Sequence, residues 1–357
     1  MSEILVNIWN VMKEGFTFLI EYAFFPGDGE TFSLMRIASL FIAFSISGAI
    51  ALFMSQSTVI KHLGPTAKKW RAYLVASVSG TVLAVCSCSV LPMFASIRKK
   101  GAGLGPAVAF LFSGPAINVL AITLTFSDLG VGIGSIRIIG AVILALVIGL
   151  LMALVYRRGE MRDENATMFA GESGDSTFKS WQKLVFFLTL LAMLIFSVYQ
   201  PLPTLFFIAL LIVEIILWLD LEDLREWGGE IWDLAKKILP LFVLGIFFAG
   251  ILQAVLSEEF LANTVGGNSL LSNGMASVAG ALMYFATLTE IPIIVSLLES
   301  GMHRGPAVAL LLAGPTLSLP NMIVIGKVLG VKRTATYVSM VVVFATIVGF
   351  LSGLWFF

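Results

Sequence analysis

The stretch S-C-S-V-L-P-M-F-A-S-I-R-K-K-G-A-G-L-G-P-A-V-A-F-L-F-S-G-P-A-I-N, residues 87–118, has a second copy later in the chain. That copy, residues 287–318, reads T-L-T-E-I-P-I-I-V-S-L-L-E-S-G-M-H-R-G-P-A-V-A-L-L-L-A-G-P-T-L-S. The two align without a gap at a separation of 200 residues, with helix-breaking residues on the same positions. Shared hydrophobicity alone does not align glycines and prolines, so the chain contains a duplicated unit.

The matched residues are those that begin or interrupt helices. Proline lacks an N–H and interrupts a helix interior, whereas in the first helical turn it is well tolerated. If the helix starts face a cavity, their free N–H groups form a partly positive surface for the oxygens of a solute. The predicted structural positions are Pro92, Gly105, Pro106, Gly114, Pro115, Pro292, Gly305, Pro306, Gly314 and Pro315.

The composition of the chain is that of a membrane protein. Of its 357 residues, 58% are hydrophobic and only 12% are charged, with a mean hydropathy of +0.98. A soluble domain carries roughly 25% charged residues, so this chain has too little polar surface to face water. The composition predicts an all-α, polytopic helical membrane protein with about 8–10 membrane segments of the usual spanning length. The candidate spans are 37–56, 72–97, 105–126, 138–156, 184–199, 204–219, 238–256, 275–298, 305–326 and 335–357.

Polar stretches divide the chain into four parts. Residues 1–156 hold a leading amphipathic segment and the first membrane repeat, and residues 157–183, rich in Gly, Ser and charge, form a cytoplasmic linker. Residues 184–219 form a hairpin of two short helices. Residues 220–357 form the second membrane repeat, which a polar connector ending at Lys237 introduces.

The positive charges predict how the repeats are oriented. Lys and Arg accumulate on the cytoplasmic side of membrane proteins. If segment 72–97 dips into the membrane and returns, the basic clusters share one face, and Arg36, Arg137 and Arg304 lie in loops on the other. The same rule makes 275–298 enter from the opposite face. The repeats are then inverted, each with a broken or re-entrant helical hairpin, as in many transporters. Two parallel repeats with long tilted helices are the alternative.

Both cysteines of the chain lie at the start of the first copy of the motif, Cys88 within residues 87–118 and Cys86 directly before them, with Ser87 between them and Ser89 after them. Cysteines this close cannot form an unstrained disulfide. Sulfur is a soft ligand suited to soft metals and metalloids, so the pair is a candidate metal-binding or solute-binding site, with Ser87 and Ser89 as further residues that contact the solute. Two thiols are too few for a structural zinc site. The alternative is that both are small buried hydrophobic side chains.

Glu290 is a carboxylate in the otherwise uncharged segment T-L-T-E-I-P, directly after Thr289. An ionisable residue at membrane depth is costly and indicates a functional site. We interpret Glu290 as the proton-coupling residue, with Thr289 as a polar neighbour that contacts solute. The alternative is that Glu290 reaches an aqueous vestibule at the mouth of the hairpin and is only solvated there.

Further polar residues follow or precede the Gly-Pro pairs within apolar sequence, namely Ser113, Asn118, Ser318 and Asn321. Amide and hydroxyl groups in a helix bundle bridge helices as readily as they bind solute, so both interpretations stand. The sequence contains no phosphate-binding glycine loop, nucleophile elbow or zinc-ligand spacing, so we expect neither an enzyme nor a bound cofactor. The zero net charge and the absence of a basic block indicate no nucleic-acid partner.

The motif resembles that of a known transporter family. The string C-S-C-S-V-L-P at Cys86–Pro92, with G-P-A-V-A-F-L and S-G-P-A-I-N after it, looks like the signature of the ArsP-type predicted-permease family. The second copy, with T-E-I-P and G-P-A-V-A, fits the same family over about residues 35–357. The resemblance implies a multi-pass permease of the inner membrane. It also implies efflux of trivalent organoarsenicals, with metal ions such as copper or zinc as the substrates of other members.

The functional hypothesis is therefore a membrane permease that exports a small soft solute, a trivalent organoarsenical, by gradient-driven alternating access. Its partners are then a metalloid or other small solute and the lipid bilayer. A copper- or zinc-type metal ion exporter and a passive channel for a small solute are the alternatives. A scaffold whose apparent site is only packing is a further possibility.

Overall fold

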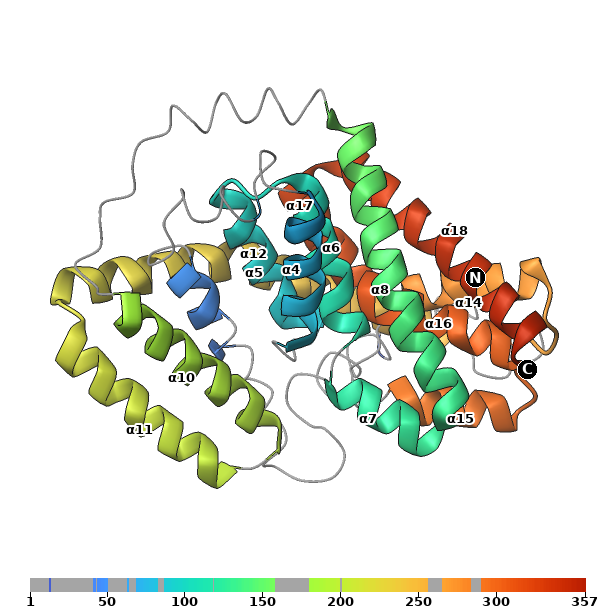
Figure 1. Ribbon diagram of the computed structural model, residues 1–357, viewed down its shortest axis with the longest axis horizontal. Coiled ribbons are helices and arrows are strands. Elements are labelled where there is room, and N and C mark those ends of the chain that lie inside the picture. Colours follow the sequence, from blue (N-terminus) through green and yellow to red (C-terminus); the bar gives the residue numbers. More distant parts are fainter. Residues whose placement is uncertain are drawn as a thin grey trace.

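The computed structural model describes residues 13, 41–42, 44–50, 63, 69–82, 87–117, 119–157, 180–199, 201–255, 265–283 and 290–357. The regular elements among these residues are all α-helices, and none of these residues forms a strand (Figure 1). The predicted all-α class is confirmed. The linker, residues 157–183, lies almost entirely outside the described residues.

The duplicated sequence folds into two matching sets of five helices. Each helix of the second set begins and ends within three residues of the position 200 residues after its counterpart. The first set is α4 (Lys69–Val82), α5 (Ser87–Lys99), α6 (Leu104–Ala116), α7 (Val119–Asp128) and α8 (Gly130–Val155). The second set is α14 (Leu270–Leu282), α15 (Glu290–Glu299), α16 (Arg304–Leu317), α17 (Leu319–Leu329) and α18 (Val331–Trp355).

Glycines fix the same turns in both sets. Gly101 and Gly301 have φ of 90° and 102°, and Gly130 and Gly330 have φ of 82° and 85°. A side chain at such φ values meets the backbone, so glycine is the residue that adopts them without strain. The two copies therefore reverse direction at the same places, before α6 and α16 and again before α8 and α18.

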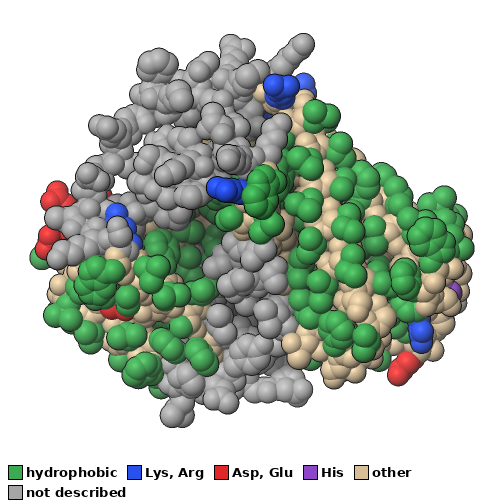
Figure 2. All heavy atoms as spheres, viewed as in Figure 1, with side chains coloured by type: hydrophobic (Ala, Val, Ile, Leu, Met, Phe, Trp, Pro, Cys, Tyr) green, Lys and Arg blue, Asp and Glu red, His purple; other side chains and the backbone are tan. Residues whose placement is uncertain are grey.

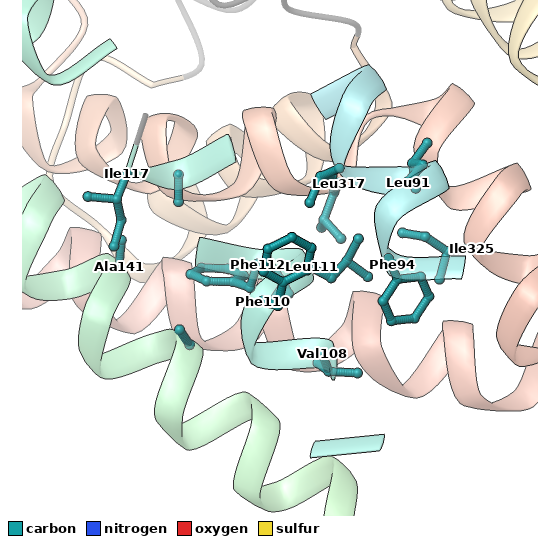
Figure 3. Packing of buried hydrophobic residues seen from close by; sticks show 14 of the residues in the cluster. Leu91, Phe94, Val108, Phe110, Leu111, Phe112, Ile117, Ala141, Leu317 and Ile325 are labelled. Atoms are coloured by element: carbon teal, nitrogen blue, oxygen red, sulfur yellow. The ribbon is translucent and has the colours of Figure 1, made fainter. Parts of the chain in front are cut away.

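The central helices α6 and α16 are the most buried of the structure. Every residue of α6 is buried, and in α16 only Arg304 is not. Each lies between the first and last helices of its own set, and the two also contact each other. Figure 3 shows side chains of α6, among them Phe110 and Phe112, in the same apolar cluster as Leu317 and Ile325 of the second set.

Glycines lie where α6 and α16 pack closely against the last helix of their own set. A Cβ atom added to Gly105 would lie 2.9 Å from the carbonyl oxygen of Gly149 on α8. A Cβ atom added to Gly305 would lie 2.9 Å from the carbonyl oxygen of Gly349 on α18. Small residues let membrane helices approach closely. The glycines that match between the two copies therefore allow α6 to pack closely against α8 and α16 to pack closely against α18.

Both central helices are followed by a bend. The axis turns by 45° between Leu104–Ala116 and Ala121–Asp128, and by 49° between α16 and α17. Gly114-Pro115 and Gly314-Pro315 occupy the last turn before each bend, as expected for helix-breaking residues. Because proline cannot donate to the helix ladder and restricts the residue before it, the helix does not continue straight past these pairs.

Two of the predicted helix breaks, at Pro92 and Pro292, need correction, whereas Pro106 and Pro306 lie at helix starts as predicted. Pro92 lies inside α5 and Pro292 lies in the first turn of α15, so neither proline ends a helix. Pro106 and Pro306 lie in the first turns of α6 and α16, where backbone N–H groups have no partner within the helix and a missing N–H costs little.

The long last helices of the two sets, α8 and α18, lie side by side and run in opposite directions (Figure 1). Near the end of α8, the Tyr156 hydroxyl donates to the carbonyl of Lys332 at the start of α18, at 3.1 Å. Near the start of α8, Gly132 lies against the Phe357 ring beyond the end of α18. The first and last turns of one helix thus meet the last and first turns of the other.

A peripheral group of helices connects the two sets. The hairpin α10 (Ser180–Tyr199) and α11 (Pro201–Trp218) forms where two short helices were predicted, and α12 (Leu221–Val255) follows (Figure 1). The polar connector and the span after it are one continuous helix of 35 residues, which corrects the prediction of separate segments. The connector is helical because Trp227, Leu234 and Ile238 recur at helical spacing and are buried.

The described part of the chain contains fewer long spans than the ten candidates that were predicted for the whole sequence. Among the described residues, α8 and α18 are long and apolar enough to cross a membrane, and the two bent pairs raise the number to four if each is one span. Figure 2 shows hydrophobic side chains over much of the visible surface of the described part. On α8, Ile139, Ile143 and Leu154 are exposed, which favours contact with lipid.

Candidate functional site

A buried ion pair joins the two sets of helices. Arg137 of α8 and Glu290, the first residue of α15, lie 3.0 Å apart from Nη2 to Oε2, and each side chain is 1% exposed. Arg137 was predicted to lie in a loop on the outer face. It lies inside α8 instead, because that helix begins at Gly130 rather than after Arg137.

The Arg137 guanidinium is bound on three sides. Its Nε donates to the carbonyl of Ala116 at 3.1 Å, its Nη1 donates to Thr125 Oγ1 at 2.9 Å, and its Nη2 donates to Glu290. Ala116 ends α6, so its carbonyl has no partner further along the helix. One side chain on α8 therefore ties together the end of α6, the following helix α7 and the start of α15.

The buried charges of Arg137 and Glu290 are stable only as a pair. Removing two charges from water costs several kcal/mol per ion, and only close, hydrogen-bonded pairing offsets the cost. Glu290 also lies at the N-terminus of α15, where the helix dipole favours a negative charge. Within the described part of the chain, Glu290 Oε1 has no hydrogen-bond partner. Because Glu290 is buried, the alternative in which it is solvated at an aqueous mouth is wrong for this conformation.

The bend between α16 and α17 holds a second group of buried polar atoms. Ser318 lies at the bend, Asn321 lies in the first turn of α17, and Tyr337 lies on α18; all three are at most 2% exposed. Among the described residues, Ser318 Oγ, Asn321 Oδ1 and Tyr337 Oη have no hydrogen-bond partner. The Ser318 side chain does not cap α17, although serine at this position normally does.

The two bends are equivalent in position but not in chemistry. At the separation of 200 residues, Tyr337 stands where Arg137 stands in the first set, and Val90 stands where Glu290 stands in the second. Val90 is buried, as Glu290 is. The charged pair at the first bend thus has no counterpart at the second, where the polar atoms are neutral.

Of the remaining predicted site residues, some lie in described helices and others lie outside the described residues. The Ser113 hydroxyl donates to the carbonyls of Ala76 and Phe110, both at 3.4 Å, which links α6 to α4. Ser87, Cys88 and Ser89 form the first turn of α5. Three predicted site residues lie outside the described residues: Cys86, Asn118 and Thr289. Among the residues that are described, no three His, Cys, Asp or Glu side chains group as metal ligands. The thiol site stays a prediction.

Sequence reasoning missed two features. Arg137 lies in the apolar run G-S-I-R-I-I-G-A-V, and an arginine within such a run is the signal that would have identified it. The second is Glu214 on α11, which is 3% exposed and whose Oε1 accepts a hydrogen bond from Thr189 at 2.6 Å, so it joins α10 to α11.

Comparison with known proteins places the chain among predicted permeases. The profile of the ArsP_1 family, described as a predicted permease, matches residues 30–354. The UPF0718 protein MJ0584 of Methanocaldococcus jannaschii is 40% identical over 368 residues, covering 98% of this chain and 97% of that protein. The UPF0718 protein YraQ of Escherichia coli is 23% identical over 304 residues, 85% of this chain and 73% of that protein. No solved structure matches.

Proposed function

Because the chain belongs to the ArsP_1 family of predicted permeases, we propose that it is a multi-pass permease of the inner membrane that exports a small soft solute by gradient-driven alternating access. The observation that carries the proposal is the buried pair of Arg137 and Glu290 at the junction of the two helix sets. A charge pair at membrane depth is costly to keep, and such residues mark ion and substrate pathways.

The arrangement of the helices supports an inverted repeat, in which one set of helices is turned over relative to the other. The equivalent helices α8 and α18 run antiparallel. The contacts between sets are also reciprocal, because α15 contacts α7 and α17 contacts α5. Inverted repeats with broken helices that meet near the middle of the membrane are the usual framework for alternating access.

The pair provides a mechanism for coupling to protons. A deprotonated Glu290 attracts Arg137 and holds the start of α15 against α8. When Glu290 takes a proton, the charge attraction is lost, while Arg137 keeps its bonds to Ala116 and Thr125. The start of α15 then loses its charge attraction to α8 and is left with its packing against α7. A proton gradient can in this way shift the equilibrium between two arrangements of the helix sets.

We propose a trivalent organoarsenical as the solute, with Cys86 and Cys88 as its first contacts. The support is the softness of thiol sulfur and the presence of both cysteines beside one copy of the duplicated motif. Export requires release as well as capture, so two thiols that leave the coordination incomplete suit a transported solute better than a resident metal.

Reconstituted vesicles test the coupling directly. We expect a pH gradient to drive methylarsonous acid to a concentration above that outside the vesicles, and the Glu290→Gln variant to equilibrate it without concentrating it. Glu230→Gln is the matched control, because Glu230 is on α12 and pairs with the exposed Lys99. Concentration by Glu290→Gln at the rate of the unaltered protein would contradict the role of Glu290. Equilibration alone by the unaltered protein would instead indicate a passive channel.

The thiol contacts are tested in cells that lack their own arsenic exporters. The Cys86→Ser, Cys88→Ser double variant should lose resistance to methylarsonous acid, with Ser300→Ala, at an exposed position after α15, as the control. Resistance unchanged in the double variant at equal expression would remove the thiols from the mechanism.

A further inference from the structure

The three neutral polar residues at the bend between α16 and α17 have no role in the ion pair. We infer that Ser318, Asn321 and Tyr337 form a binding site for a neutral, hydroxyl-bearing solute. The inference rests on the proposed permease function and assigns the chemical class of the solute that it moves.

The burial of these atoms indicates that something else satisfies them. A buried polar group without a hydrogen bond costs about 1–3 kcal/mol, and native proteins leave few of them. Here three such atoms occur around one bend and its neighbouring helix. Ser318 and Asn321 are three residues apart at the start of α17, which places them on one face of the chain.

The position of Tyr337 follows from its counterpart. Arg137 leaves α8 and reaches the carbonyl of Ala116 at the end of α6. Tyr337 occupies the same position on α18, which packs against both α16 and α17. If the Tyr337 side chain follows the course of Arg137, it extends toward the end of α16 and its hydroxyl faces the bend at which Ser318 lies.

The chemistry of the three groups selects the class of ligand. Asn321 Oδ1 needs a donor, whereas the hydroxyls of Ser318 and Tyr337 both donate and accept. A hydroxyl on the solute supplies both functions. No carboxylate replaces Glu290 at this bend, since Val90 stands in its place. A charged ligand would therefore be buried without a counter-charge, which is costly at membrane depth. A neutral solute avoids that cost.

This assignment gives the two bends different tasks. The first bend holds the titratable pair that responds to the gradient, and the second holds groups that hydrogen-bond the solute. Arsonous acids in their neutral form carry hydroxyls on arsenic and match the second bend. Exchange at the two cysteines forms As–S bonds and releases the arsenic hydroxyls as water, so the second bend binds the solute before this exchange or after water has displaced the thiols and restored the hydroxyls.

The test measures binding and stability on the full chain in lipid nanodiscs. The probes are methylarsonous acid and methylboronic acid, which presents two hydroxyls but has no affinity for thiols. We expect Ser318→Ala, Asn321→Leu and Tyr337→Phe each to raise the Kd for both probes roughly two- to tenfold, the effect of losing one ordinary hydrogen bond. Thr316→Val is the matched control. Its buried hydroxyl already bonds to the carbonyls of Leu312 and Ala313, so its Kd should not change.

A second measurement does not depend on the identity of the solute. Without ligand, Tyr337→Phe removes an unpaired hydroxyl, so its melting temperature should equal or exceed that of the unaltered protein. A lower melting temperature would mean that the hydroxyl has a structural partner, and would overturn the inference. Stabilisation by Na⁺ that the Asn321→Leu variant loses would also overturn it, in favour of a cation site.

The outcomes separate this inference from the proposed function. Unchanged Kd values for both probes in all three variants would overturn the site while leaving gradient-driven transport intact. If transport fails to respond to Glu290→Gln but the three variants lose binding of methylboronic acid, the site stands and the coupling mechanism falls. Failure of the unaltered protein to bind either probe would overturn the assigned solute class.

Discussion

Removing either partner of the buried ion pair should destabilise the protein far more than removing both. We consider Arg137→Met, Glu290→Leu and the double variant that carries both changes. Each single change leaves one charge in the interior without its partner, 1% exposed to solvent. The double change replaces both with apolar side chains.

The contacts set the size of the effect. Breaking a buried pair by removing one partner costs about 3–5 kcal/mol, whereas apolar replacement of both is often nearly neutral. Arg137 also donates to Ala116 and Thr125. Thr125 keeps its own bond to the carbonyl of Ala121 in every variant, so the extra loss in the double variant is about 1–3 kcal/mol for the carbonyl of Ala116. We therefore expect the double variant to be more stable than either single variant.

Reversible unfolding in mixed micelles with a rising fraction of SDS gives the four free energies of unfolding. The difference between the double change and the sum of the single changes is the coupling energy, expected at about 3 kcal/mol or more. The control cycle is Lys99→Met with Glu230→Leu, an exposed pair whose coupling should stay below about 1 kcal/mol. Additive single effects at Arg137 and Glu290 would show that the two do not pair, and would refute the reasoning.

Three further outcomes follow from the packing. Gly349→Ala should destabilise the chain by about 1–3 kcal/mol, since its Cβ would lie 2.8 Å from the carbonyl oxygen of Gly305. Gly326→Ala is the control, because no atom lies near its Cβ, and it should be neutral or stabilising by up to about 1 kcal/mol. Thermal unfolding of the two variants measures the difference. Gly301→Ala should cost about 1 kcal/mol in the same assay because of its positive φ, although nothing lies within 4 Å. Thr189→Val should cost about 1–3 kcal/mol by leaving a buried carboxylate oxygen on α11 unsatisfied, and equal stability would show that this bond has no net effect.

The repeat could be read from the sequence because its signal consists of residues with restricted conformations. Gly101 and Gly301 adopt matching positive φ values, and Gly105 and Gly305 pack against matching glycines. Such residues report the backbone directly, so an alignment of glycines and prolines predicts an alignment of helices. The bends after Gly114-Pro115 and Gly314-Pro315 follow from the same rule.

The ion pair could not be read from the sequence. Arg137 and Glu290 are 153 residues apart, and only the packing of α8 against the second set brings them together. The positive-inside rule placed Arg137 in a loop on the outer face, because the rule counts arginines in loops and does not consider an arginine within a span. Propensity rules likewise placed breaks at Pro92 and Pro292, although a proline within the first turns of a short helix does not end it.

The sequence predicted two of the three residues of the neutral site at the second bend. Ser318 and Asn321 were recognised as polar residues beside a Gly-Pro pair. Tyr337 was not, since a tyrosine in an apolar helix is usually a packing residue. Its equivalence to Arg137 gives it meaning only once the guanidinium of Arg137 is seen to reach the end of α6.

The central claim is that the two sets of helices enter the membrane from opposite sides. Lys99 and Glu299 end the equivalent helices α5 and α15 and are both exposed. In a chain with Cys86 and Cys88 replaced by serine, a single cysteine at each position can be labelled in intact cells with a membrane-impermeant maleimide. We predict that the two positions react from opposite sides, Glu299→Cys from outside and Lys99→Cys only after permeabilisation. Labelling of both from the same side would contradict the account.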